Sequence, residues 1–390
     1  METPLGPWAK SFPSSSWWMP PHEFLGTAPR LSAFATPLLT IDASATAHNV
    51  HLMANWLAPR GLEIAPHGKT TMAPQLWRQM LDAGAWGITL ATGWQVQLAR
   101  SFGIRRILIA NELIDPVALR WLGAELADPA FEFACWVDSV EAVELMRAGL
   151  AGAARPVDVL VELGGARTGA RTVEAALAVA AAVEAAPELR LAGVGGYEGS
   201  LGHDRSPATI AAILRYLDDV VRVHGAIHWG QKPLVTAGGS AYFELVAERL
   251  GPLVGSATVI LRSGAYQVHD DGFYAGITPL SGFRSAMHGW ARVLSTPEPG
   301  LAILDGGKRD FPYDEGMPVT SFGQIEKLND QHAYLRGASS AVADLPRVGQ
   351  VLRLGLSHPC TAFDKWRIIP VLDNADADDP LVVDLVRTYF

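Results

Sequence analysis

The sequence predicts an α/β protein built from a (β/α)8 barrel and a second, mainly β domain at its C-terminal end. Between residues 63 and 262, eight short apolar segments alternate with helical segments. Such continuous apolar runs are typical of buried parallel strands, each of which needs a crossover helix. After residue 281 the segments become strand-like and are joined by Gly, Pro and Asp turns. The 390 residues, 49% of them apolar, suffice for two packed domains.

The eight predicted barrel strands are evenly spaced, which favours a closed barrel over a doubly wound open sheet. They are residues 63–66, 87–90, 106–110, 131–137, 157–163, 191–197, 233–237 and 258–262. Helices between them are expected to begin at capping residues, some followed by proline. These starts are Thr92, Asp115 with Pro116, Ser139, and Ser206 with Pro207.

Three regions are predicted along the chain. Residues 1–35 form an irregular, aromatic-rich arm that we expect to cover a core or a partner subunit, residues 36–280 the barrel, and residues 281–390 the β domain. A strand at 37–41 precedes a helix that begins near Ser44, with Asp42 or Ser44 as its cap. The barrel does not need that strand, so it can belong to the β domain. The β domain's own strands are expected at 290–296, 301–305, 321–326, 332–336, 351–356 and 368–372.

Composition excludes several classes of protein. The net charge of −9, from 31 basic and 40 acidic residues, disfavours binding to nucleic acid. Two cysteines, Cys135 and Cys360, cannot form a disulfide framework, which fits a reducing compartment. The N-terminal segment lacks the apolar stretch of a signal peptide, and the most apolar internal run is interrupted by Glu184 and Pro187. We therefore expect a cytoplasmic protein that binds neither nucleic acid nor membrane.

Polar residues at the carboxyl ends of barrel strands are the candidates for chemistry, because barrel enzymes act at that end. Lys69 follows the first strand, and a lysine whose pKa is lowered by its surroundings forms Schiff bases. Considered alone, it is more often a surface lysine. Arg167 and Tyr197 follow adjacent strands and are expected to enter the same mouth, where they could hold a flat polar ligand or serve as structural hydrogen-bonding groups.

A glycine turn follows the seventh predicted strand. Gly238, Gly239 and Ser240 precede a helix at 242–250, and backbone N–H groups at such a turn form a cradle for an anion. A tight turn without a ligand also requires glycine. A lysine, a cradle and polar rim residues together point to pyridoxal 5′-phosphate (PLP), whose aldehyde needs the lysine and whose phosphate needs the cradle.

The β domain carries a candidate metal motif. His358 and Cys360, separated by one residue, would lie on the same side of an extended chain and suit zinc. The motif is weak alone, since a buried cysteine beside a solvent-exposed histidine is commoner. Cys135, within an apolar run, is expected to be plain core.

These residues together resemble the D-serine dehydratase and D-threonine aldolase-like PLP enzymes of the alanine racemase fold type. The resemblance spans residue 37 to the C-terminus and rests on five motifs in order. They are Pro66-His67-Gly68-Lys69-Thr70, Glu162-Leu-Gly-Gly-Ala-Arg167-Thr-Gly, Gly238-Gly239-Ser240, Arg262-Ser-Gly-Ala-Tyr266 and Ser357-His358-Pro-Cys360.

The resemblance implies PLP on Lys69, a divalent metal beside it and a homodimer with sites near the subunit interface. Lys69 would then act as the base at Cα of a D-amino acid. His67 would contact the cofactor, Arg167 its 3′-oxygen and Tyr197 its ring nitrogen. The remaining implied contacts are Gly238, Gly239, Ser240 and Tyr266 to the phosphate, and His358 and Cys360 to zinc. One departure is clear: the histidine expected soon after Tyr197 is displaced to His203.

The resemblance favours a dehydratase that converts a D-3-hydroxy amino acid such as D-serine to a 2-oxo acid and ammonia. The alternative is retro-aldol cleavage to glycine and an aldehyde, but such aldolases are expected to carry aspartate where this chain has Cys360. A racemase needs a second acid/base group that the sequence does not offer. A non-catalytic PLP-binding protein would need only the barrel, and a PLP-free metal hydrolase would need ligands at several strand ends.

Overall fold

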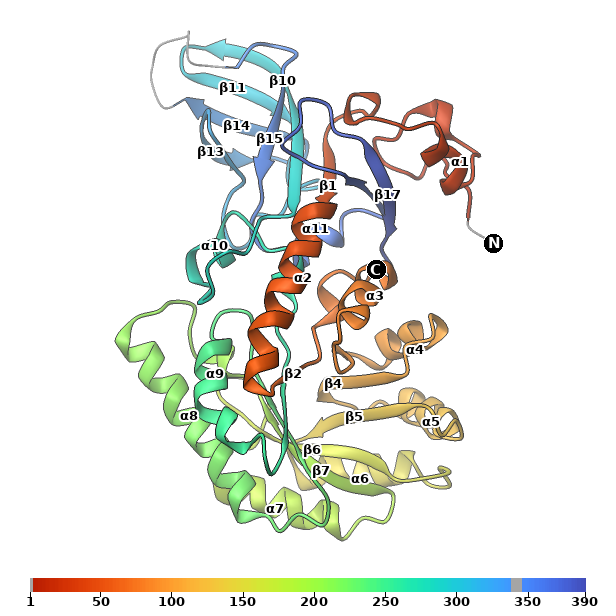
Figure 1. Ribbon diagram of the computed structural model, residues 1–390, viewed down its shortest axis with the longest axis vertical. Helices are drawn as coiled ribbons and strands as arrows, with labels where there is room; N and C mark the ends of the chain where they lie inside the picture. Colours follow the sequence, from red (N-terminus) through yellow and green to blue (C-terminus); the bar gives the residue numbers. More distant parts are fainter. Residues whose placement is uncertain (1–2, 338–345) are drawn as a thin grey trace.

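A barrel of eight parallel strands forms one end of the computed structural model, which describes residues 3–337 and 346–390 (Figure 1). Its strands follow the order β2-β9-β8-β7-β6-β5-β4-β3. The two ends of that order meet, because the Trp86 N–H donates to the Ile64 carbonyl at 2.7 Å and Thr89 pairs with His67. The strands are β2 (Glu63–Ile64), β3 (Ile88–Leu90), β4 (Arg106–Glu112), β5 (Glu132–Val137), β6 (Val157–Leu163), β7 (Leu189–Gly196), β8 (Leu234–Ala237) and β9 (Thr258–Leu261). The predicted barrel is confirmed.

Helices surround this barrel and begin where the capping residues predict. The side chains of Thr92, Asp115, Ser139 and Ser206 each accept a backbone N–H at a helix start, as does Asp42. The helices are α2 (Ala43–Leu57), α3 (Pro74–Asp82), α4 (Gly93–Ser101), α5 (Pro116–Glu125), α6 (Val140–Gly149), α7 (Val173–Glu184), α8 (Pro207–Ala226) and α9 (Phe243–Leu250). None of the helices in the described residues is long and apolar enough to cross a bilayer.

The second domain is built on a nine-stranded sheet of order β11-β14-β13-β12-β15-β10-β1-β16-β17. Its members are β1 (Leu38–Asp42), β10 (Met287–Glu298), β11 (Leu301–Asp305), β12 (Val319–Thr320), β13 (Gly323–Leu328), β14 (His332–Gly337), β15 (Val351–Gly355), β16 (Ile368–Leu372) and β17 (Val382–Arg387). The strand that precedes the barrel, β1, therefore lies in this sheet between β10 and β16. The sequence did not predict β17, because a register shift against β16 breaks its alternation of buried and exposed residues.

The N-terminal arm packs on the β domain beside β17 (Figure 1). It contains short helical turns, including α1 (Pro21–Gly26), so it is less irregular than predicted. Phe12, Phe24 and Phe34 form a cluster with ring centroids 5.0–5.9 Å apart and join the core of this domain. Trp18, by contrast, is 74% exposed. The arm thus covers the β domain's core with phenylalanines, and its tryptophans contribute unevenly.

The C-terminus and a short helix connect the two domains. The Tyr389 N–H donates to the Met72 carbonyl at 2.9 Å, so the last residues lie against the barrel. Helix α11 (Cys360–Phe363) contacts the turn at Gly68–Thr70, and α10 (Phe273–Ile277) follows the last barrel strand. The β-domain motif at His358 is thereby brought to the mouth of the barrel.

Candidate active site

A cavity of about 160 Å³ opens at the carboxyl ends of the barrel strands. Most of the predicted site residues line it, although they come from both domains. These are His67, Lys69, Arg167, Tyr197, Gly239, Ser240, His358 and Cys360. The cavity therefore unites the candidate lysine, the polar rim residues and the candidate metal motif.

Lys69 lies on a single 3₁₀ turn, Gly68–Thr70, directly after β2. Its side chain reaches the open cavity, yet desolvation by the surrounding protein lowers the pKa of its amine. The Cys360 thiol acts in the opposite direction, and the cation of Arg167 lowers the pKa further. The Thr70 hydroxyl lies 3.3 Å from the Cys360 sulfur. The lysine amine thus has an enlarged neutral fraction and stands beside the β-domain motif.

Arg167 and Tyr197 lie together, as their adjacent strands predict. The guanidinium carbon of Arg167 is 4.9 Å from the centroid of the Tyr197 ring. Burial, with a contribution from Glu198, raises the pKa of Tyr197 to about 12. The phenol therefore keeps its proton at neutral pH and can donate a hydrogen bond into the cavity.

The glycine turn has the geometry of a cradle, but a carboxylate of the chain already engages part of it. Gly238 has φ of +104°, and a Cβ on Gly239 would lie 2.8 Å from the Tyr197 ring, so both positions require glycine. Their N–H groups donate to the two carboxylate oxygens of buried Glu198, at 2.9 and 2.7 Å. The part of the turn that lines the cavity is Gly239 and Ser240, with the neighbouring Ser263–Ala265 segment; of the two, Ser240 has no bond to Glu198.

Two residues named from the sequence lie away from the cavity. Tyr266 is buried in the barrel core, where its ring packs 6.2 Å from that of Phe283. His203 is exposed, and its ring approaches Phe273 at 6.5 Å. Neither side chain lines the cavity.

Arg262 belongs to one of the five motifs but was assigned no role from the sequence. It directly follows β9, the last barrel strand, and is only 1% exposed. Its Nη1 donates to the Thr236 hydroxyl at 2.6 Å and its Nη2 to the Gly196 carbonyl at 2.5 Å, while its Nε has no partner. Among the neighbouring groups, Glu198 compensates the charge of Arg262 most strongly. The available signal was an arginine inside a buried strand segment, since an uncompensated buried cation is costly.

The metal motif does not have the extended backbone that the sequence predicted. His358 adopts a left-handed conformation with φ of +57°, and helix α11 begins at Cys360. The two side chains nevertheless meet. A hydrogen bond with Cys360, together with Asp314 and against the effect of burial, raises the pKa of His358 to about 9. Burial alone would raise the pKa of Cys360, but His358, Thr70 and Lys69 lower it, which favours the thiolate that metals bind.

A cluster of three carboxyl groups lies at the ends of β4, β5 and β6. Oxygens of Glu112, Asp138 and Glu162 are within 4.8 Å of one another. Burial and a hydrogen bond that the protonated Glu162 donates to Glu112 raise the pKa of Glu162 to about 8, so this pair holds a proton at neutral pH. The Asp138 carboxylate accepts the Gly169 N–H at 3.0 Å and so orders the loop that carries Arg167.

The residues of the cavity fit PLP and a divalent metal. Lys69 offers the amine, and three buried polar atoms on the cavity wall have no hydrogen-bond partner among the described residues: His67 Nδ1, Trp136 Nε1 and Arg262 Nε. Burial and the Lys69 charge lower the pKa of His67 well below its ordinary value, so it is neutral. An imidazole and a thiolate form a donor set suited to zinc.

Family comparison identifies the barrel. The model of the family described as "Alanine racemase, N-terminal domain" matches residues 41–250, more than half of the chain. The chain belongs to this family. A second model, "Putative serine dehydratase domain", matches residues 286–372 of this alanine racemase-type chain. The resemblance inferred from the motifs is confirmed.

Individual relatives agree over nearly the whole length. The chain is 28% identical to the D-threonine aldolase of Arthrobacter sp over 90% of this chain and 92% of that protein. The solved D-threonine aldolase of Filomicrobium marinum matches with a TM-score of 0.81 and 25% identity, covering 93% of this chain and 96% of the other. A variant of D-threo-3-hydroxyaspartate dehydratase, solved in its metal-free form, shares the fold at a TM-score of 0.75 and 21% identity, covering 93% and 99%.

Proposed function

We propose that this protein is a PLP- and zinc-dependent lyase that converts a D-3-hydroxy amino acid such as D-serine to a 2-oxo acid and ammonia. The observation that carries the proposal is the convergence of Lys69 with His358 and Cys360 in one cavity, where Thr70 lies 3.3 Å from the thiol. When bound, PLP supplies an electron sink for charge at Cα, and a divalent metal supplies a Lewis acid for the β-oxygen.

Lys69 provides the proton-transferring group in this proposal. Because its pKa is lowered, a larger fraction of the amine is neutral than in an ordinary lysine, and the neutral amine can take the Cα proton of the substrate. The Tyr197 phenol, which stays protonated, donates a hydrogen bond to the ring nitrogen, and Arg167 contacts the 3′-oxygen. His358 and Cys360 hold the metal on the β-domain side of the cavity. The two domains thus contribute different parts of one site.

We assign different roles in cofactor binding to the glycine turn and to Arg262. Since Glu198 engages the N–H groups of Gly238 and Gly239, these glycines fix the shape of the turn. We place the phosphate at Ser240 and the adjacent Ser263–Ala265 segment, which face the cavity. The unpartnered Arg262 Nε supplies a further donor to the bound ring system.

Retro-aldol cleavage to glycine and an aldehyde is the second candidate. The observation in its favour is the 28% identity to a D-threonine aldolase along 90% of this chain. The match of the β domain to a serine dehydratase model and the His358–Cys360 donor set favour elimination. In elimination the β-oxygen departs, whereas in cleavage it loses only its proton.

We also propose that the protein is a homodimer with its sites near the interface. Exposed apolar side chains lie at the starts of α4, α5 and α6, which all follow strand ends on the cavity side of the barrel. They include Trp94 at 53% exposed and Val117 at 61%. A second copy covering this rim would remove that surface from water. Light scattering of the PLP-loaded protein should give twice the chain mass; a monomer at micromolar concentration contradicts the dimer.

One product assay tests the reaction. PLP-loaded protein is incubated with D-serine and with D-threonine, with and without a chelator, and 2-oxo acid and glycine are measured in the same mixture. Chelator-sensitive 2-oxo acid without glycine supports the dehydratase. Glycine plus aldehyde contradicts elimination in favour of an aldolase, and retention of neither PLP nor activity contradicts the lyase assignment altogether.

A further inference from the structure

Carboxylates from other segments hold His358 at two points, one on its imidazole and one on its backbone N–H. Its Nδ1 lies 2.6 Å from Asp314 Oδ2, and its backbone N–H donates to Asp270 Oδ2 at 2.9 Å. The other oxygen of Asp314 accepts a hydrogen bond from the Thr361 hydroxyl at 2.6 Å. Both oxygens of Asp314 are therefore used inside the protein, and the carboxylate cannot easily rotate.

Asp270 fixes the backbone of this loop. Its Oδ1 accepts the N–H groups of Gly272 and Tyr274, at 3.1 and 2.8 Å, which ties the start of α10 to the segment that carries His358. His358 has φ of +57°, a region that non-glycine residues occupy only when surrounding contacts enforce it. The hydrogen bond from its backbone N–H to Asp270 is such a contact. Backbone and side chain of His358 are thus fixed by separate aspartates.

The ring contacts determine which nitrogen is free. With Nδ1 engaged by Asp314, the nitrogen left for a ligand is Nε2, and the imidazole also hydrogen-bonds the Cys360 thiol. A carboxylate on Nδ1 fixes the tautomer of a ligating histidine and orients its ring. Without it, the ring could rotate about its χ2 bond and present either nitrogen.

We infer that Asp314 is a positioning residue for the metal site: it holds His358 so that Nε2 and the Cys360 sulfur face the same point in the cavity. This inference rests on the proposed function, because it concerns the metal that His358 and Cys360 would hold. We assign Asp314 no ligand role, because it is not among the residues that line the cavity and its two oxygens bond to His358 and Thr361. The sequence gives no sign of it, as Asp314 lies 44 residues before its partner.

The test is zinc affinity of the PLP-loaded protein, measured by competition with a chromophoric chelator. Asp314→Ala should weaken zinc binding by about 10- to 100-fold, as is usual for loss of such a partner. Asp314→Asn should retain most of the affinity, because its amide can accept from Nδ1–H and donate to the Thr361 hydroxyl. Thr361→Val should cause a smaller loss than Asp314→Ala. Asp330→Ala, at an exposed aspartate elsewhere in the β domain, is the matched control and should change nothing.

The outcomes separate this inference from the proposed function. Cys360→Ala should abolish stoichiometric zinc binding; if the parent protein binds no zinc, or this variant binds it unchanged, the metal site itself is wrong and the inference falls with it. If Cys360→Ala abolishes binding but Asp314→Ala matches the parent protein within twofold, only the role of Asp314 is overturned. Equal losses in Asp314→Asn and Asp314→Ala also overturn it, since charge and not orientation would then matter. In cobalt-substituted protein, Asp314→Ala should alter the d–d absorption bands, while Asp330→Ala should not.

Discussion

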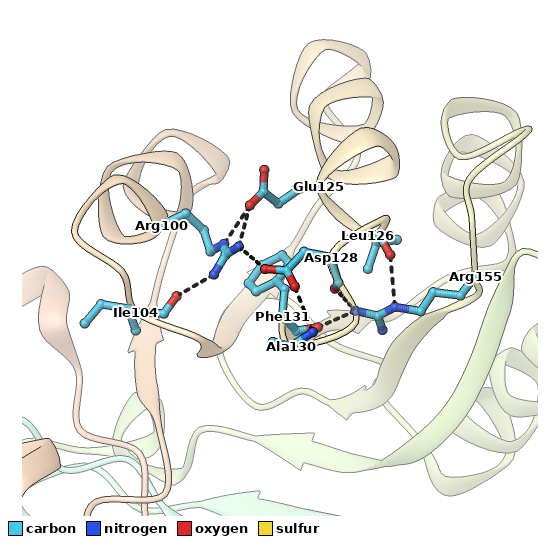
Figure 2. Close-up of polar contacts among 8 residues, drawn as sticks. All are labelled: Arg100, Ile104, Glu125, Leu126, Asp128, Ala130, Phe131 and Arg155. Atoms are coloured by element: carbon cyan, nitrogen blue, oxygen red, sulfur yellow. Dashed lines mark hydrogen bonds and ion pairs between the residues drawn. The ribbon is translucent and has the colours of Figure 1, made fainter.

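Cationic side chains at the two ends of the barrel differ in how fully they are paired with other groups of the protein. At the amino-terminal ends of the strands, Arg100 pairs with Glu125 and Asp128, and Arg155 donates to the carbonyls of Leu126 and Phe131 (Figure 2). At the carboxyl-terminal ends, Lys69, Arg167 and Arg262 surround an open cavity, and Arg262 Nε lacks a partner.

The comparison shows what distinguishes a structural cation from a functional one. The guanidinium of Arg100 bonds to groups within the protein, including the Ile104 carbonyl, and its central carbon lies 4.3 Å from the centroid of the Phe131 ring. These contacts therefore stabilise the fold. The cations of the cavity repel one another and lower the pKa of Lys69 and the pKa of His67. Such an arrangement is costly in the free protein and favours an anionic ligand.

The largest expected effect is at Lys69. Lys69→Ala should reduce turnover at least about 1,000-fold, because it removes the proposed base, whose amine is the only one among the described residues that line the cavity. It should also remove the visible absorption of bound PLP while leaving the melting temperature nearly unchanged, since the amine forms no hydrogen bond with any of the residues that the structure describes. Lys308→Ala, at an exposed lysine, is the control. Unaltered colour and activity in Lys69→Ala would contradict the site.

Replacement of Arg262 should damage both fold and site. Arg262→Met keeps the volume but leaves buried Glu198 without its nearby cation, so we expect the free energy of unfolding to fall by about 3 kcal/mol. PLP affinity should fall as well, because the variant removes the Nε donor. Chemical denaturation and equilibrium dialysis of PLP measure the two effects. A loss of stability with PLP affinity unchanged would show that Arg262 is structural only.

Arg100→Ala should affect stability alone. The variant removes charge-assisted hydrogen bonds from a side chain that is 13% exposed, and we expect a loss of about 2 kcal/mol. kcat/KM per folded molecule should stay unchanged, because Arg100 lies in the last turn of α4, at the amino-terminal ends of the strands, whereas the cavity lies at their carboxyl ends. Urea denaturation and a standard assay on the same preparation compare the two. Loss of activity without loss of stability would remove the distinction between the two ends.

The smallest effect concerns pH. Burial raises the pKa of Glu162 from 4.5 to about 8, so the folded state binds an extra proton between those values and this group's contribution to stability falls as pH rises through them. Glu162→Gln mimics the protonated form. Relative to the parent protein, its free energy of unfolding should therefore increase from pH 5.5 to 8.5 by at least about 1 kcal/mol. A pH-independent difference would show that Glu162 is ionised in the fold.

Much of the fold could be predicted because its signals are local. Helix starts follow from capping residues such as Thr92 and Ser139, which bond to backbone three residues away. Barrel strands follow from uninterrupted apolar runs. β17 was not predicted because a register shift against β16 interrupts its alternation of buried and exposed residues. That shift arises from the pairing of the two strands and is not visible in the sequence of either.

The sequence predicted which residues belong to the candidate site better than it predicted how those residues are arranged. Lys69, Arg167 and Tyr197 were found because strand ends meet at one end of a barrel. Tyr266 was misplaced because it follows the same strand as Arg262 but lies on a turn that directs it into the core. Glu198 was missed because its contacts, with Gly238 and Gly239, come from the neighbouring strand's loop.

The sequence by itself determined the alternation of strands and helices, the caps, and the residue types that a PLP lysine and a soft metal pair require. Only the tertiary structure decided that β1 joins the second domain, that Glu198 engages the glycine turn, and that His358 turns left-handed to meet Cys360. The reason is physical. Periodicity and capping act over a few residues, whereas Asp270 and Asp314 reach His358 from 88 and 44 residues away, and these contacts exist only once the chain has folded.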